Sequence, residues 1–202
     1  MNQKLSQPTT TDGRELRSIR TRAAIIEAWL SWIDEGDMAP TAKQVADRAY
    51  IGLRTVFQHF SDMQALQQAA GETHFARLTP LLGEVSAELP LPERIDMAVA
   101  TRGRLFECTT PVRRAAMREE WNSSMIREFI DAVEQGYLAD TGRVFAHELD
   151  LIPEVSRETV MLALDGALSW AHWNHLVQRR ELTRERAEAV VRLMVNALLK
   201  TR

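Results

Sequence analysis

The chain has 202 residues and a mass of 23.0 kDa, enough to bury a hydrophobic core in one large domain or two small ones. With 45% hydrophobic and 26% charged residues, its composition is globular and excludes disordered, collagen-like and disulfide-stapled chains. The net charge of −3 excludes a uniformly cationic nucleic-acid coat but allows a local basic surface. A single cysteine, Cys108, can form neither an internal disulfide nor a four-cysteine zinc site.

The N-terminal segment is polar, and we expect residues 1–13 to form a flexible arm. The segment lacks the apolar core of a signal peptide. No stretch of the sequence reaches the roughly 18 consecutive apolar residues that a membrane helix needs. The sequence therefore predicts a cytoplasmic protein that does not bind membranes.

Apolar residues recur at three- and four-residue spacing from Arg14 almost to the C-terminus, without the alternation typical of strands, so we expect an all-α fold. The first helix should end near Gly36, and Thr41 with Gln44 has the spacing of a capping box. The same pattern recurs from Ser61. Helices are predicted over 53–60 and from 61 onward, then over 92–107, 111–121, 124–147, 154–178 and 184–200, with Thr110 capping Pro111.

Residues 41–60 contain two short predicted helices joined by a turn, which is the pattern of a helix-turn-helix motif. On the second of these helices, Val56 and Phe60 lie one turn apart and should face the core. Arg54 and Gln58 lie one turn apart on the opposite side, with Thr55 beside them. Such side chains contact base edges and phosphates, although an ordinary solvated polar face would show the same spacing.

Residues of a recognisable pattern extend over roughly residues 17–66. They are Thr21, Arg22, Ile25 and Ala28, then Thr41, Val45, Ala46 and Ala49, then the run from Thr55 to Phe60, and finally Ala65 and Leu66. In these residues the sequence resembles the tetracycline-repressor (TetR) family of bacterial transcription regulators. The resemblance implies a helix-turn-helix DNA-binding domain over 14–64 and a helical ligand-binding and dimerisation domain over 65–202. Beyond the motif it is limited to helix content and length.

The resemblance implies a dimeric repressor that a small-molecule effector releases from a double-stranded, palindromic DNA operator. Arginines clustered at the start of the first helix also predict a basic edge there, with a solvated helix end as the alternative. The residues expected at the DNA are Arg17, Arg22, Thr41, Lys43, Leu53, Arg54, Thr55, Phe57, Gln58 and His59.

Three residues depart from the pattern of the family. Tyr50 stands where a turn glycine is usual, Phe57 where a tyrosine often contacts phosphate, and Met63 where a lysine often does. A left-handed conformation is unfavourable for tyrosine. Loss of two phosphate contacts predicts weaker non-specific DNA binding and a shallower salt dependence.

Two C-terminal helices carry apolar bands that are wider than one packing face needs, which predicts a four-helix interface with a second copy; internal core is the alternative. Aromatic and methionine residues between them and residue 92 can line an effector pocket, although such residues are more often core. The expected interface residues are Leu168, Ala171, Val191, Met194, Val195 and Leu198, and the pocket candidates are Trp121, Met125, Phe129 and Met161.

Other chemistry has less support in the sequence. His172 and His175 have the spacing of a metal pair without an evident third ligand, so we expect no metal and no cofactor. Cys108 could act as a redox-sensing thiol, but an inert residue is the simpler interpretation. No nucleophile motif or phosphate-binding loop indicates an enzyme. The remaining alternative is a helical adaptor or ligand sensor whose helix-turn-helix binds protein.

Overall fold

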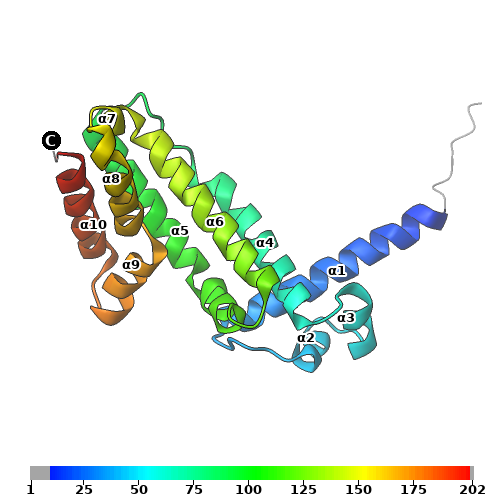
Figure 1. Cartoon of the computed structure of the whole chain (residues 1–202). Helices are drawn as coiled ribbons and strands as arrows, with labels where there is room; N and C mark the ends of the chain where they lie inside the picture. The colour runs from blue at the N-terminus through cyan, green and yellow to red at the C-terminus, as the bar shows by residue number, and fades with distance from the viewer. Residues whose placement is uncertain (1–9, 201–202) are drawn as a thin grey trace, which may run out of the picture. The chain divides into compact units, whose positions relative to one another are not determined.

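The computed structural model describes residues 10–200, with the side chains of residues 10–12, 81 and 82 left out of the description. Within that range the chain is helical and contains no strand, which confirms the predicted all-α fold (Figure 1). The elements are α1 (Thr10–Asp34), α2 (Ala42–Arg48), α3 (Leu53–His59), α4 (Met63–Leu82), α5 (Leu91–Glu119), α6 (Ser124–Val144), α7 (Ala146–Asp150), α8 (Glu154–Ala167), α9 (Trp170–Asn174), a π-helix η1 (His175–Arg179) and α10 (Arg184–Leu199).

The chain divides into two compact units. The helix-turn-helix unit comprises the chain up to Thr73 together with Pro111–Ser123, and the second unit comprises His74–Thr110 together with the chain from Ser124. The division falls inside α4 and α5 rather than at the expected boundary between residues 64 and 65. The first half of α4 belongs to the first unit because its Leu66 and Ala70 are fully buried there.

Helix α1 begins earlier than expected. Residues 10–13, which we expected in the flexible arm, already belong to the helix, while residues 1–9 lie outside the described range. Residues 10–20 contain no proline, and the acidic residues near the start favour a helix N-terminus. The helix ends at Asp34, and Gly36 follows it with a φ of 97°, as the sequence predicts for a terminating glycine.

The core of the helix-turn-helix unit is formed by the apolar faces of its helices. Ile33 of α1, Val45 of α2, and Val56 and Phe60 at α3 belong to one buried cluster, with exposed fractions of 5% or less. This packing confirms that Val56 and Phe60 face inward. It follows that the opposite side of α3 faces away from the core.

Two predicted helix starts have different outcomes. The capping box at Thr41 is confirmed, because its Oγ1 accepts from the Gln44 amide at 3.3 Å and Gln44 Oε1 accepts from the Thr41 amide at 2.8 Å. The predicted cap at Ser61 is wrong. Asp62 caps α4 instead, accepting from the Ala65 amide at 2.8 Å and from Ser61 Oγ at 3.0 Å. These two hydrogen bonds lower the pKa of Asp62.

The expected break before Pro111 is also wrong, because α5 runs through it without interruption. Thr110 does not cap a new helix. Its hydroxyl donates to the Phe106 carbonyl within α5 and accepts from Trp170 Nε1 at 2.9 Å. Proline has no backbone N–H to donate within the helix. Packing of buried side chains on both sides of it, such as Phe106 and Val112, nevertheless stabilises a continuous helix.

The last predicted helices differ in extent from the observed ones. Residues 124–147 form α6, which ends at Val144, and the start of α7. Residues 154–178 form α8, α9 and η1, because Ser169 leaves the helical conformation and caps α9 by accepting from the His172 amide at 3.2 Å. The prediction for the last helix is confirmed by α10, which Thr183 caps.

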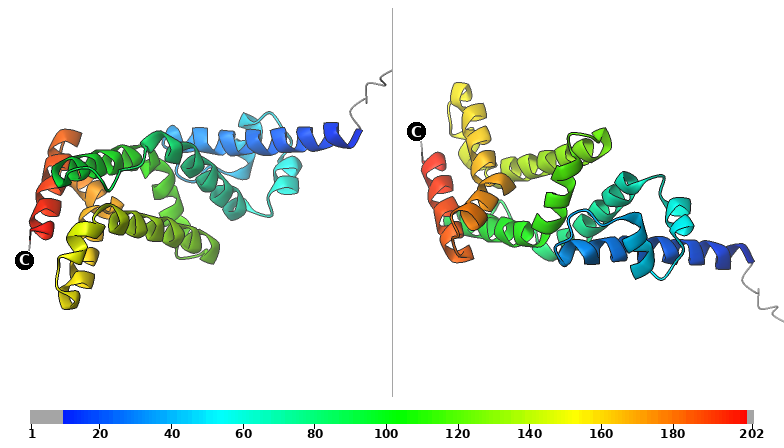
Figure 2. Two further views of the ribbon diagram at one scale, coloured as in Figure 1. Left: turned by 90° about the horizontal axis from the view of Figure 1, so that it is seen from above. Right: turned by 90° about the horizontal axis from the view of Figure 1, so that it is seen from below.

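The second unit is built on a larger core that includes Phe106, Tyr137 and Leu164. Gly103 allows the closest approach in it, because a Cβ at that position would lie 2.7 Å from the ring of Trp173. Figures 1 and 2 show α8 and α10 side by side at one end of this unit, where the two helices contact each other. No described helix is both long and apolar enough to span a lipid bilayer.

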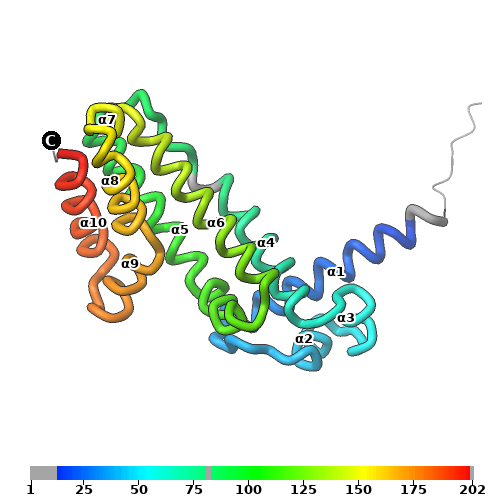
Figure 3. Tube along the Cα trace, viewed as in Figure 1, coloured from blue at the N-terminus to red at the C-terminus, as the bar shows by residue number. Residues whose placement is uncertain are grey.

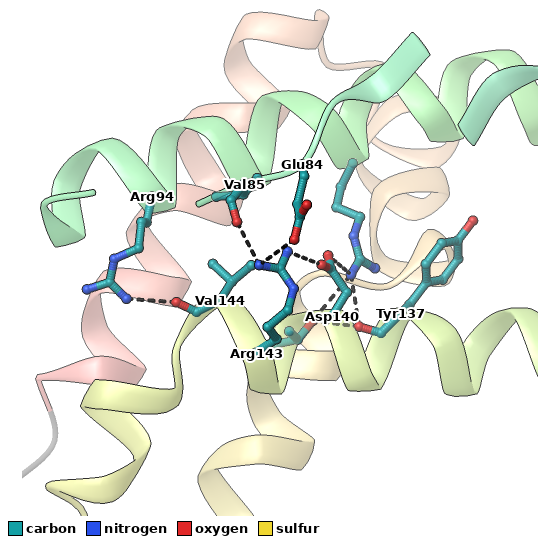
Figure 4. Close-up of polar contacts among 9 residues, drawn as sticks. Glu84, Val85, Arg94, Tyr137, Asp140, Arg143 and Val144 are labelled. Atoms are coloured by element: carbon teal, nitrogen blue, oxygen red, sulfur yellow. Dashed lines mark hydrogen bonds and ion pairs between the residues drawn. The ribbon is translucent and has the colours of Figure 1, made fainter. Parts of the chain in front are cut away.

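A buried ion pair lies inside this unit. Arg94 binds Glu148 through two hydrogen bonds of 2.7 and 2.6 Å. Its Nη1 also donates to the Val144 carbonyl at 2.7 Å, as Figure 4 shows. Burial raises the pKa of Glu148, but the hydrogen bonds from Arg94 and from the backbone, together with the charges of Arg94 and His147, lower it by more, so that the pKa lies below its usual value. The pair connects α5 to α7.

Candidate nucleic-acid interface

The turn between α2 and α3 sets the direction of the second helix (Figure 3). Tyr50 has a left-handed backbone with a φ of 55°, and its amide donates to the Asp47 carbonyl at 3.2 Å. The Ile51 amide donates to the Ala46 carbonyl at 3.0 Å and closes the turn. The left-handed conformation, which glycine adopts most readily, is thus adopted here by a tyrosine, whose side chain is 95% exposed.

The outer face of α3 carries the predicted DNA-contacting side chains. Arg54 and Gln58 are exposed, and Leu53 and Phe57 are exposed by 46% and 48%. Thr55 and His59 are half-buried at the edges of this face. We call the surface formed by Leu53, Arg54, Thr55, Phe57, Gln58 and His59 the α3 face.

The two predicted contacts at the start of α2 are engaged within the chain. The Thr41 hydroxyl lies 2.7 Å from Gln44 Oε1, and Lys43 Nζ lies 2.6 Å from Asp47 Oδ2. Both members of the Lys43–Asp47 pair are largely exposed, and such surface pairs are weak. A phosphate could therefore replace Asp47 on Lys43 at little cost.

The two arginines predicted from α1 have different surroundings. Arg17 is exposed, with Nε donating to the Gly13 carbonyl at 3.2 Å. The Arg22 guanidinium lies 4.8 Å from the centre of the Phe60 ring, a cation–π contact that fixes it beside the end of α3. Both lie within the helix-turn-helix unit, with exposed guanidinium-bearing side chains.

Arg48 is near the motif but has a structural role. Its two terminal nitrogens bind the Glu35 carboxylate at 2.8 and 2.7 Å, and the guanidinium stacks 3.6 Å from the centre of the Trp32 ring. Hydrogen bonding to Arg48 lowers the pKa of Glu35. These contacts tie α2 to α1 and leave Arg48 unsuited to bind DNA.

Structural comparison finds the same architecture in solved proteins. A transcriptional regulator from Rhodococcus sp. Rha1 superposes with a TM-score of 0.68 at 17% identity, covering 91% of this chain and 96% of that one. A Mesorhizobium loti protein assigned to the TetR family gives 0.67 at 18% identity, with the same coverage. A TetR-family regulator from Streptomyces coelicolor gives 0.66 at 19% identity, covering 90% and 87%.

The chain has the TetR-family fold. No protein-family model matches the sequence, and no curated protein matches it. At these identities the similarity concerns the fold, so the roles of individual residues in this chain rest on its own geometry.

A cavity of about 740 Å³ opens in the second unit of the TetR fold, between α4, α5 and α6. Of the four predicted pocket residues, Phe129 lines it. The other three do not line this cavity: Trp121 is 85% exposed and belongs to the other unit, Met125 is 41% exposed, and Met161 packs against the core. The sequence analysis missed the lining residues Phe75, Leu105, Tyr137, Asp140 and Arg143.

The residues of the predicted dimer surface differ in exposure. Leu168, Val191 and Val195 are 3% exposed or less and belong to the core of their own unit, while Met194 and Leu198 pack against that core. Only Ala171 of the predicted set is exposed. The apolar side chains that point outward from α8 and α10 are Val155 (89% exposed), Leu162 (58%) and Leu193 (71%).

The sequence also singled out two histidines and a cysteine as candidates for metal binding or redox chemistry. In that part of the chain, no three His, Cys, Asp or Glu side chains gather as metal ligands would. His175 is exposed, whereas burial and then the proximity of His175 lower the pKa of His172. Cys108 is exposed, and its backbone carbonyl lies 3.1 Å from His74 Nε2.

Proposed function

We propose that this chain is a sequence-specific DNA-binding transcriptional regulator that inserts α3 into the major groove. The observation that supports the proposal best is the polarity of α3, which is anchored by Val56 and Phe60 and presents Arg54 and Gln58 to solvent. Arginine binds guanine and glutamine binds adenine with paired hydrogen bonds in that groove. A protein that binds DNA acts where the DNA is, so we expect it in the cytoplasm.

We further propose that the regulator works as a dimer. Recognition helices must be about 34 Å apart to reach successive major grooves of a palindromic operator, and a two-fold dimer provides such a pair. The outward face of α8 and α10, which we define by Leu162 and Leu193 with Val155, Ala189 and Ala197, supplies exposed apolar surface for it.

The mode of regulation that we propose is repression relieved by a small molecule. The cavity of about 740 Å³ has a size typical of ligand sites. A ligand acts as an effector only if it binds one arrangement of the DNA-binding units better than another. Helix α4 begins in the helix-turn-helix unit and ends at the cavity, so it offers a continuous path for that coupling.

The decisive experiment replaces Arg54 and Gln58 together by alanine. We expect the variant to remain dimeric but to lose its preference for an operator in its own upstream DNA, by about 1–3 kcal/mol for each lost paired contact. Gel-shift titration with operator and scrambled duplexes measures this preference.

The matched control is a double alanine variant of Gln178 and Arg179, two exposed residues of the same types in the second unit. It should bind like the wild type. An unchanged operator preference in the Arg54 and Gln58 variant would falsify the recognition assignment. Binding of the wild type to a protein, with no preference for any duplex, would support the adaptor alternative instead.

A further inference from the structure

The cavity of the second unit has apolar walls and one charged end. Phe75 and Tyr137 contribute aromatic rings whose centres are 6.3 Å apart, and Leu105 and Phe129 extend the apolar lining. The charged end contains two arginines and two carboxylates, described below. A ligand that fills this cavity must therefore carry a bulky apolar part and a polar group at one end.

One carboxylate at the charged end is fully engaged. Asp140 accepts from Arg102 Nη2 at 3.2 Å and from Arg143 Nη2 at 2.8 Å (Figure 4). Arg102 is buried, lies 4.4 Å from the centre of the Tyr137 ring and also donates to the Tyr137 carbonyl at 2.9 Å. Asp140 and Arg102 are therefore fixed parts of the wall.

The other carboxylate is the replaceable one. Glu84 Oε1 lies 3.2 Å from Arg143 Nη1, while the same nitrogen donates to the Val85 carbonyl at 2.9 Å. The Glu84 side chain is 78% exposed and that of Arg143 is 39% exposed, so their pair is a weak surface contact. Figure 4 shows the Arg143 guanidinium between Glu84 and Val85 on one side and Asp140 on the other.

We propose that the effector is an amphipathic organic acid, with an aromatic or branched apolar body and one carboxylate that takes the place of Glu84 on Arg143. Binding of a cationic ligand is disfavoured, because two guanidiniums would repel it and the carboxylates described here already pair with those guanidiniums. An incoming carboxylate keeps the charge balance of the site and satisfies the guanidinium with the same chemical group. The inference rests on the proposed function, since it specifies the effector of that regulator.

The replacement has a structural consequence for α4. Gly83 follows this helix with a φ of 69°, which turns the chain so that Glu84 and Val85 reach Arg143. Displacement of Glu84 removes one of the contacts that hold the end of α4 against α6. The acid would thereby bind best to the arrangement in which this end is released.

The test compares three probes that share one apolar body: phenylbutyrate, phenylbutyramide and phenylbutylamine. Calorimetric titration of the full-length protein should show the acid binding at least about tenfold more tightly than the amide, because a charge-assisted contact is lost in the amide. Glu84→Gln should strengthen acid binding by about threefold and leave amide binding unchanged, because it removes the internal competitor.

Arg143→Gln should weaken acid binding by about tenfold or more. Arg143→Lys keeps the positive charge but lacks the planar guanidinium, so its affinity for the acid should lie between those of Arg143→Gln and the wild type. The control is Arg180→Gln, at an exposed arginine of the second unit outside the lining, which should behave as wild type. Because Glu84 is exposed, its variant remains informative even if an Arg143 variant fails to fold.

The inference is overturned if phenylbutyrate does not bind, if acid and amide bind equally, or if the amine binds best and loses affinity in Glu84→Gln. Gel shifts on the same samples show whether only the ligand class fails or the proposed regulatory function fails as well. Acid binding that leaves operator affinity unchanged supports the ligand class and contradicts the effector role. Operator binding by a protein that takes up none of the three probes contradicts the ligand class alone.

Discussion

At the scale of single residues, Tyr50 combines a left-handed backbone with an almost fully exposed side chain. We expect Tyr50→Gly to stabilise the protein by about 0.5–1 kcal/mol, because relief of about 1–2 kcal/mol of backbone strain is partly offset by the greater freedom of glycine in the unfolded chain. Urea denaturation measures the change. Tyr50→Ala is the control, since it removes the ring but keeps a Cβ; a similar gain from alanine would contradict strain as the cause.

Phe57 and Met63 test the phosphate contacts at the same scale. Met63→Lys should strengthen binding to operator and random DNA alike and should steepen the salt dependence of log K by about 0.9, because one more counterion is released. Phe57→Tyr adds a neutral hydroxyl and should raise affinity without changing that slope. Gel shifts at several salt concentrations measure both effects.

The control for these variants is Met125→Lys, which adds the same charge at a methionine of the second unit with 41% exposure. It should leave the slope near that of the wild type. A gain confined to one DNA sequence in Met63→Lys would show that position 63 contacts a base rather than a phosphate.

At the scale of secondary-structure elements, the pair of Arg94 and Glu148 joins α5 to α7 through a buried contact. Glu148→Gln should destabilise the protein by about 3–5 kcal/mol, because it leaves Arg94 buried without its counter-charge. Asp150→Asn is the matched control. It breaks a pair with Arg157 of 3.6 Å whose side chains are 76% and 42% exposed, and such pairs contribute about 0–1 kcal/mol.

The same pair predicts a dependence on pH. The pKa of Glu148 is lowered in the folded state, so its stabilisation is fully present above the pKa of the unfolded chain and is lost as the pH falls through the folded value. Thermal denaturation between neutral and acidic pH should show a steeper loss of stability in the wild type than in Glu148→Gln. Parallel curves for the two proteins would exclude this pair as a source of acid sensitivity.

Elements that depend on local signals could be predicted, and those that depend on distant contacts could not. Thr41 and Gln44 form the expected capping box because both partners lie within one turn. Pro111 was misinterpreted as a helix start because its local preference is overridden by buried neighbours on both sides. Ser169 can cap a helix, but the apolar periodicity continues across it and predicts one uninterrupted helix. In the structure Ser169 is the N-cap of α9, so the stretch is divided there.

At the scale of the whole molecule, the dimer is the central prediction. Leu193→Asp, with Leu162→Asp as a second variant, should convert the protein to monomers and abolish operator binding, because a carboxylate would be buried at the apolar face. Analytical ultracentrifugation at micromolar concentration measures the change. Leu151→Asp is matched to Leu193 in exposure, at 72% against 71%, and should remain dimeric. Retention of the dimer in both test variants would exclude the outward face of α8 and α10.

The sequence alone could not distinguish an interface from a core, nor assemble the cavity. Val191 and Val195 have the same spacing that an interface residue would have, and burial by α8 and its neighbours is a property of the folded unit. The cavity combines Phe75, Arg102 and Arg143, which lie on three different helices. No local pattern connects residues so far apart in the chain, whereas the α3 face lies within a single short segment.

The approach of Trp173 to Gly103 restricts how this protein can diverge. Even alanine at position 103 would place a methyl carbon 2.7 Å from an indole that is 4% exposed, so that the packing around the ring would have to change. Homologous proteins that lose this glycine are therefore expected to carry a smaller residue in place of the tryptophan, so that the two sites covary across evolution.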